Sequence, residues 1–279
     1  MDEEEIHMSE CNHDCSNCSE NCDSKKIEKK LPLADTKIHK IVGVLSGKGG
    51  VGKSMVSSLL AIELAKKGYS VGIMDADITG PSIPKLFDLK DPAYGDEEGV
   101  FPNLSHKYGI KILSINMMLE SEDTPVLWRG PIIGGMVSQF YTEAHWGELD
   151  YLVIDMPPGT SDVALSVLQD IPVDGLVMVT NPSKLVSMIV SKAIVMAQKT
   201  DTKLIGLVEN MAYVKCPDCG RIINIHGNSE SEEIAEKYGI DILASIPLDT
   251  HLAQIADEGS VEEYEEDYIE ELVKRVINF

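Results

Sequence analysis

One short stretch, SGKGGVGKS at residues 46–54, narrows the choice of fold more than any other part of the chain. It fits the pattern G-x-x-x-x-G-K-S/T of a loop that binds phosphate groups. An apolar run of strand length precedes it, and the residues after it are apolar at the spacing of a helix. Such a loop works between a strand and a helix, so the stretch predicts an α/β fold with a nucleotide site.

The residue types in this loop match the chemistry of a nucleoside triphosphate. Glycines let backbone N–H groups turn toward phosphate oxygens, while Lys53 brings charge to the β and γ phosphates and Ser54 offers its hydroxyl to Mg2+. We expect Lys53 to lie at an exposed anion site. The residues expected to bind the nucleotide are Gly47, Lys48, Gly49, Gly50, Val51, Gly52, Lys53 and Ser54.

Apolar runs of strand length alternate with helix-length segments along the rest of the chain. The runs are residues 40–46, 70–76, 110–115, 150–156, 174–180, 203–210 and 241–247. Such alternation predicts one doubly wound α/β domain, with a mostly parallel sheet of about seven strands covered on both faces. We expect this domain at residues 38–279, after a flexible acidic tail at residues 1–37 that lacks hydrophobic periodicity.

Carboxylates end two of the expected strands. Asp155 ends a buried strand in DYLVIDMPPGTSD, where such folds hold Mg2+ through water; a helix cap or turn residue is the weaker alternative. Asp75 and Asp77 end the second strand on the same side of an extended chain. We expect Asp75 near the metal and Asp77 orienting the attacking water.

The cysteines form two separate groups. Cys216 and Cys219 in CPDCG supply half of a four-ligand site, and the nearby His226 would bring the set only to three. From this loop alone, zinc and an iron-sulfur cluster are equally good interpretations. The stretch CNHDCSNCSENC is denser than zinc sites usually are and closer to ferredoxin-type runs; its thiols are Cys11, Cys15, Cys18 and Cys22.

The net charge of −22 is concentrated at the two ends of the chain. Residues 1–24 contain no Lys or Arg, and neither does EEYEEDYIEE near the C-terminus. This charge repels nucleic acid and anionic lipid, and no apolar run is long enough to span a bilayer. We therefore expect a cytoplasmic protein with reduced thiols and with neither a membrane nor a nucleic acid as partner.

Several motifs together resemble a known family. Lys48, just after the first glycine, resembles the deviant Walker A signature of the ATPase group that includes nitrogenase iron protein, MinD and ParA. With DADITGPSIP, WRGP, DMPPGTSD, VENM and CPDCG in this order, residues 38–259 look like the Mrp/ApbC family of P-loop ATPases, the iron-sulfur cluster carriers. The four-cysteine tail resembles that of the longer members.

The resemblance implies a homodimer that binds ATP, hydrolyses it slowly and transfers 4Fe-4S clusters. Lys48 would reach the partner's nucleotide, and Asn210 would contact the adenine. Cys216 and Cys219 with their symmetry mates would hold one bridging 4Fe-4S cluster, with another cluster on the tail. The implied partners are apo iron-sulfur proteins and the cluster assembly machinery. Hydrolysis would use Lys48, Lys53 and Asp77, with Ser54 and Asp155 on Mg2+.

Two other functions remain open. The first is a positioning ATPase of MinD or ParA type, which would bind a membrane or DNA, and on a membrane would use the C-terminal segment. That segment follows an acidic run, so we expect a helix packed on the core through Ile269, Leu272, Val273 and Val276. The second is a zinc-stabilised nucleotide-binding regulator.

Overall fold

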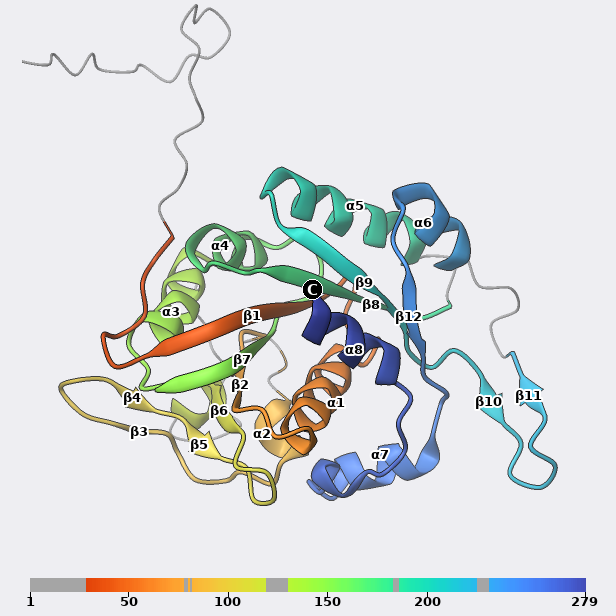
Figure 1. The fold of residues 1–279 in the computed structure, drawn as a ribbon, viewed down its shortest axis with the longest axis horizontal. Coiled ribbons are helices and arrows are strands. Elements are labelled where there is room, and N and C mark those ends of the chain that lie inside the picture. The colour runs from red at the N-terminus through yellow and green to blue at the C-terminus, as the bar shows by residue number, and fades with distance from the viewer. Residues whose placement is uncertain (1–28, 78–79, 81, 119–129, 183–185, 225–230) are drawn as a thin grey trace, which may run out of the picture.

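A computed structural model describes residues 29–77, 80, 82–118, 130–182, 186–224 and 231–279, without the side chains of residues 130–132 and 186–189. An eight-stranded sheet forms its centre, in the order β12-β9-β8-β1-β7-β2-β6-β5 (Figure 1). The strands are β1 (Lys37–Ser46), β2 (Val71–Asp75), β5 (Asn103–Leu104), β6 (Lys111–Ser114), β7 (Glu148–Asp155), β8 (Gly175–Thr180), β9 (Lys203–Glu209) and β12 (Ile242–Ser245).

The predicted doubly wound, mostly parallel sheet is confirmed. Each of the seven apolar runs forms one of the strands that pair in parallel. The eighth strand, β5, was not predicted; it pairs antiparallel with β6 at the edge of the sheet. Two hairpins lie outside the sheet, β3 (Tyr94–Gly95) with β4 (Val100–Phe101), and β10 (Val214–Lys215) with β11 (Ile222–Ile223).

Helices cover both faces of the sheet and enclose two apolar cores (Figure 1). One core includes side chains of α1 (Lys53–Lys66), α2 (Ile83–Leu86), α7 (Thr250–Asp257) and α8 (Glu270–Asn278). The other includes side chains of α3 (Gly130–Thr142), α4 (Asp162–Asp170), α5 (Val186–Lys199) and α6 (Ser231–Tyr238). Two 3-10 turns, η1 (Ile115–Met118) and η2 (Val261–Glu263), complete the described elements.

The continuous apolar runs follow from this arrangement. Val44 and Leu45 are consecutive in β1 and fully buried, but they pack in different cores. Successive residues of a strand point to opposite faces, so a sheet covered twice needs apolar residues at every position. The phosphate-type loop leaves the end of β1, which lies in the middle of this sheet between β7 and β8.

The C-terminal helix packs on the domain, as the sequence predicts. Ile269, Leu272, Val273 and Val276 are all buried, and the Lys40 ammonium donates hydrogen bonds to carbonyls at the end of the helix. The apolar face of α8 is therefore occupied by the core. Within the described ranges, none of the helices combines the length and the apolar character that a bilayer crossing needs.

The first described residues lie against α4. Lys29 Nζ donates to the Leu168 carbonyl, and Lys30 Nζ lies 2.7 Å from Asp170 Oδ2. The division of the chain near residue 37 stays a prediction. The tail cysteines Cys11, Cys15, Cys18 and Cys22 lie outside the described residues, as does His226.

Candidate functional site

Glycines shape the loop at residues 46–54. Gly50 and Gly52 both have φ of 78°, a backbone conformation that residues with a side chain rarely adopt. A Cβ atom on Gly52 would lie 2.1 Å from Asn210 Nδ2, whereas one on Gly49 or Gly50 would meet nothing within 4 Å. The loop is thus closed toward Asn210 and open above Gly49 and Gly50, as a phosphate cradle requires.

Lys53 is buried rather than exposed, which corrects the expectation from the sequence. Its side chain is 6% exposed, and Nζ lies 2.8 Å from Asp155 Oδ1 and 3.4 Å from Asp77 Oδ2. Burial alone would lower the pKa of Lys53, but these carboxylates outweigh it and raise the pKa above its ordinary value. Nζ forms no hydrogen bond of good geometry with the described residues, so its donors fit an incoming phosphate.

The register of the sheet brings the predicted carboxylates together. Asp75 in β2 and Asp155 in β7 lie opposite one another at the ends of neighbouring strands. Ser54 Oγ, at the start of α1, donates a 2.6 Å hydrogen bond to Asp155 Oδ2. A serine hydroxyl beside a strand-ending carboxylate is the pair that Mg2+ needs in addition to phosphates and water, so these residues fit the ion.

Asp75, unlike Asp77 and Asp155, makes no ion pair with Lys53 among the described residues. It is fully buried; Oδ2 accepts a hydrogen bond from Ser114 Oγ, and Oδ1 accepts one from the Asp77 backbone. Burial, with the nearby charge of Asp155, raises the pKa of Asp75 to about 8. A carboxyl that keeps its proton at neutral pH binds a cation weakly, so ligation of Mg2+ by Asp75 stays a prediction.

Some residues of this site were not predicted. Ser57 Oγ donates to Asp155 Oδ1 over 2.7 Å, and the Gly159 N–H donates to the Ser46 carbonyl over 2.7 Å. Ser57 follows Ser54 by three positions on a helix, so both hydroxyls face the same side and the spacing alone could have indicated it. The Gly159 bond, in contrast, depends on tertiary packing between two distant loops.

Asn210 lies beneath the phosphate-type loop. Its side chain is buried, and Nδ2 donates a 2.9 Å hydrogen bond to the Val51 carbonyl. This bond joins the end of β9 to the loop and holds the loop backbone in place. Contact of Asn210 with a base stays a prediction. Lys48 is half-buried, and its carbonyl accepts a hydrogen bond from Ser46 Oγ.

Cys216 and Cys219 lie at the tip of the β10–β11 hairpin, which projects from the body of the protein (Figure 1). The Cys216 N–H bonds to the Arg221 carbonyl, and Gly220, with φ of 70°, bonds back to Cys216. Cys219 is exposed and Cys216 is half-buried. Across the described part of the chain, no group of three or more His, Cys, Asp or Glu is placed to hold a metal ion.

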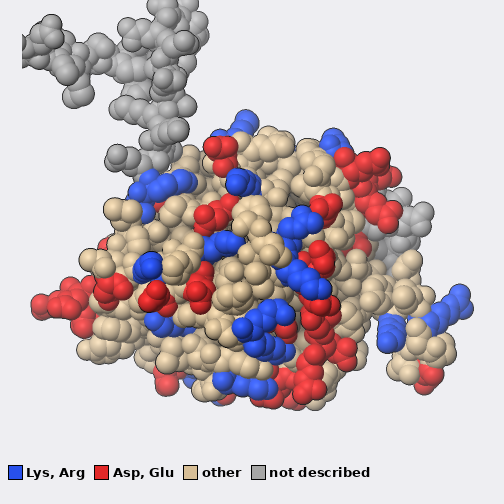
Figure 2. All heavy atoms as spheres, viewed as in Figure 1, with Lys and Arg blue, Asp and Glu red and all other residues tan. Residues whose placement is uncertain are grey.

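The turn lowers the pKa of one of the two thiols. Hydrogen bonds from the backbone N–H groups of Cys219 and Asp218, and from the Cys219 thiol, lower the pKa of Cys216. A lower pKa favours the thiolate, which is the form that binds metals. The hairpin therefore carries two neighbouring thiols near its tip, one exposed and one half-buried. Figure 2 shows Lys and Arg side chains on this projecting part of the surface.

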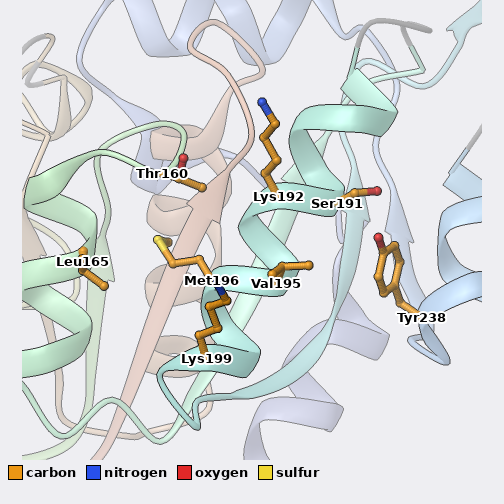
Figure 3. A pocket seen from close by; sticks show the side chains of 8 residues that line it. All are labelled: Thr160, Leu165, Ser191, Lys192, Val195, Met196, Lys199 and Tyr238. Carbon is orange, nitrogen blue, oxygen red and sulfur yellow. The ribbon is translucent and has the colours of Figure 1, made fainter. Parts of the chain in front are cut away.

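A separate cavity of about 540 Å3 lies between α4, α5 and α6 (Figure 3). Met196 and Val195 of α5 lie in its middle, and Lys192 and Lys199 lie toward opposite ends of it. None of its lining residues belongs to the loop at residues 46–54, so the cavity is separate from the phosphate site. Its lining is Thr160, Leu165, Ser191, Lys192, Val195, Met196, Lys199 and Tyr238.

Comparison with solved structures supports a nucleotide-binding fold. The chain is similar to a nucleotide-binding protein of Archaeoglobus fulgidus in complex with ADP, at 46% identity and a TM-score of 0.75 over 84% of this chain and 91% of that one. It is also similar to the cell division ATPase MinD of Pyrococcus furiosus, at 20% identity and a TM-score of 0.62 over 86% of this chain and 97% of that one. The second likeness shows the fold alone.

Sequence comparisons identify the family. An iron-sulfur cluster carrier protein of Clostridium perfringens is 44% identical over 259 residues, which are 90% of this chain and 90% of that protein. The ParA family model, described as NUBPL iron-transfer P-loop NTPase, matches residues 37–278. The resemblance to iron-sulfur cluster carriers of the MinD and ParA group is thereby confirmed. The chain belongs to the ParA family of NUBPL iron-transfer P-loop NTPases.

Proposed function

We propose that this chain is a homodimeric carrier that binds ATP, hydrolyses it slowly, and transfers 4Fe-4S clusters to apo iron-sulfur proteins. The observation that carries the proposal is the exposed Cys216–Cys219 half-site on a chain that also has a complete phosphate loop. The relatives named iron-sulfur cluster carrier protein support the cargo, and the ADP-bound neighbour supports the nucleotide.

Hydrolysis would use residues that already lie together. ATP would supply the γ-phosphoryl group, and Lys53 would neutralise charge on its β and γ phosphates. Ser54 and Asp155 would hold Mg2+, while Asp77, whose Oδ2 lies 3.4 Å from Lys53 Nζ, would position the attacking water. Lys48 of each chain would reach the nucleotide of the other, so complete charge neutralisation would need the dimer.

The half-site explains why the carrier would be a dimer. A 4Fe-4S cluster takes four thiolates, whereas each hairpin offers two. A two-fold axis between two hairpins brings Cys216 and Cys219 of both chains together in one isologous site. The cluster is then cargo between subunits, and the nucleotide state would control how the hairpins face each other.

The tail would hold a second cluster. Cys11, Cys15, Cys18 and Cys22 supply four thiols within twelve residues, a complete set in one chain. We infer a cytoplasmic location, because a reducing compartment keeps clustered thiols available for metals. The partners we propose are apo iron-sulfur proteins and the cluster assembly machinery, with neither nucleic acid nor membrane.

Anaerobic reconstitution of the full chain tests this function. In a variant with all four tail cysteines changed to serine, iron and sulfide should give about four iron atoms per dimer and a shift from monomer to dimer. Adding Cys216→Ser to that variant should remove both the iron and the dimer. One tightly bound zinc per monomer, without dimerisation, would support the zinc-stabilised regulator instead.

A further inference from the structure

The β10–β11 hairpin has two chemically different faces. Val214 pairs with Ile223, and Lys215 pairs with Ile222. Directly opposite residues of an antiparallel pair share a face, and successive residues alternate between faces. Val214 and Ile223 thus share one face, while Lys215 and Ile222 share the other.

Cys216 extends the first of these faces. The Cys216 N–H donates a 2.9 Å hydrogen bond to the Arg221 carbonyl, and the Gly220 N–H donates back to the Cys216 carbonyl, so Cys216 lies opposite both Gly220 and Arg221 just beyond the pair of Lys215 and Ile222. Alternation therefore returns Cys216 and Arg221 to the side of Val214 and Ile223. We call the side with Val214, Cys216, Arg221 and Ile223 the cysteine face, and the side with Lys215 and Ile222 the lysine face.

Each face carries an exposed isoleucine. Ile223 on the cysteine face is 47% exposed, and Ile222 on the lysine face is 59% exposed. Both belong to a two-stranded ribbon that pairs with no other strand of the described chain. The ribbon therefore exposes an apolar side chain on each face. The residues beside each isoleucine indicate which face contacts a partner.

Each face carries one basic residue, Lys215 or Arg221, so the position of that residue relative to Cys216 distinguishes the two faces. The chain carries a net charge of −22, yet residues 212–224 contain Lys215 and Arg221 against Asp218 as the one acid. Basic side chains are visible on the projecting hairpin at the right of Figure 2. A cluster bound by four thiolates is anionic, and nearby positive charge stabilises it. Of these two basic residues, Arg221 is the one whose backbone bonds to Cys216 across the ribbon.

We propose that the cysteine face meets the same face of a second copy of this chain, and that Arg221 of each copy stabilises the shared anionic cluster. Ile223 and Val214 of the two copies form the apolar part of this contact. The lysine face of each copy points away from the other copy. The reverse arrangement would direct Cys216 away from the two-fold axis, so the two copies could not share its sulfur. This inference rests on the proposed carrier function and assigns the partner surface of the same site.

Two substitutions of equal charge test the role of Arg221. In the variant without tail cysteines, Arg221→Gln should speed the loss of cluster iron to an added chelator about tenfold, the size typical for lost partners around a metal site. Lys215→Gln removes the same charge from the other face and should change this rate by less than about twofold. Arg221→Lys should restore most of the slow release.

Two substitutions of equal size test the apolar contact. Ile223→Ser should weaken cluster-dependent dimerisation by at least about tenfold, measured by sedimentation, because it removes an apolar side chain from each half of the interface. Ile222→Ser should leave dimerisation within about twofold of the parent. ATP binding should be the same in every variant, which would show that each variant is folded. If a serine variant does not fold, the pair Ile223→Val and Ile222→Val takes the place of the serine pair.

The outcomes separate two different failures. If the parent protein binds its cluster without dimerising, the shared-cluster function itself is wrong. If the parent dimerises as expected but the two faces respond equally, or the lysine face responds more strongly, the carrier function stands and the assignment of the cysteine face is overturned.

Discussion

Ser57 Oγ donates a 2.7 Å hydrogen bond to Asp155 Oδ1, while Ser54 Oγ binds the other oxygen of the same carboxylate at 2.6 Å. The Lys53 carbonyl, one turn earlier in α1, lies 3.1 Å from Ser57 Oγ and is the longer, alternative acceptor of the same proton. The first turn of α1 thus orients the strand-ending carboxylate through two hydroxyls. Substitution of a residue that orients a metal ligand through a hydrogen bond commonly lowers metal affinity or activity by about 10- to 100-fold.

Ser57→Ala should therefore lower the rate of ATP hydrolysis about 10- to 100-fold, because the Asp155 carboxylate loses the partner that orients it. The measurement is kcat, with the dependence on Mg2+ concentration, at saturating ATP. Ser58→Ala is the matched control. Ser58 is equally buried, but its hydroxyl bonds to the Ser54 carbonyl and touches no carboxylate. Equal effects of the two changes would show that Ser57 acts only on helix packing.

Lys53→Ala should abolish ATP binding and also destabilise the protein, by about 3–5 kcal/mol. The change leaves the Asp155 carboxylate buried without the ammonium that lies 2.8 Å away. Urea unfolding and ATP titration measure the two effects. Lys48→Ala removes the same charge from a half-buried position in the same loop, so stability and most of the ATP affinity should remain while hydrolysis falls. ATP hydrolysis that survives Lys53→Ala would disprove the phosphate site.

Asp75→Asn should make the stability of the protein less dependent on pH. Burial and the nearby Asp155 charge raise the pKa of Asp75 from 3.8 to about 8 in the folded protein. Between these values the unfolded chain releases a proton that the folded chain keeps, so the free energy of unfolding of the wild type falls as pH rises from about 4 to 8. Asparagine has no proton to release, and its amide can still bond to Ser114.

Denaturant unfolding without nucleotide, at several pH values, measures this difference. The curve of the Asp75→Asn variant should be flatter than that of the wild type between pH 4 and 8. Two parallel curves would show that Asp75 is ionised in the fold at neutral pH.

Cys216 should react with iodoacetamide at a lower pH than the cysteine of a short unstructured peptide, in the metal-free protein. Hydrogen bonds from the backbone of Cys219 and Asp218 lower the pKa of Cys216, so more of it is thiolate. Peptide mass spectrometry after short exposures at several pH values gives the pH midpoint of the Cys216 reaction. A midpoint equal to that of the free peptide, or above it, would contradict the geometry of the turn.

The parts of this fold that the sequence predicts are those with long, continuous patterns. The seven parallel strands are buried on both faces, so their apolar runs stand out and match the structure. The missed strands β3, β4, β5, β10 and β11 have two residues each, too few for any alternation to become visible. The apolar face of α8 was predicted because its residues recur at helical spacing.

The residues of the candidate site likewise fall into two groups, those that a local pattern predicts and those whose contacts depend on the order of the strands. The phosphate loop is a local motif, so its residues were found from their spacing. The burial of Lys53 and the Ser114 bond to Asp75 depend on which strands lie side by side, namely β2 between β7 and β6. That order is a property of the whole sheet, and no local pattern contains it.

The position of the hairpin also determines whether the protein would stay folded after it releases a cluster. In small zinc domains the metal completes the core, so release of the metal means unfolding. Here β10 and β11 pair only with each other among the described strands, and neither core includes their residues. Release of a cluster would therefore leave the domain folded, and the same chain could bind another cluster without refolding.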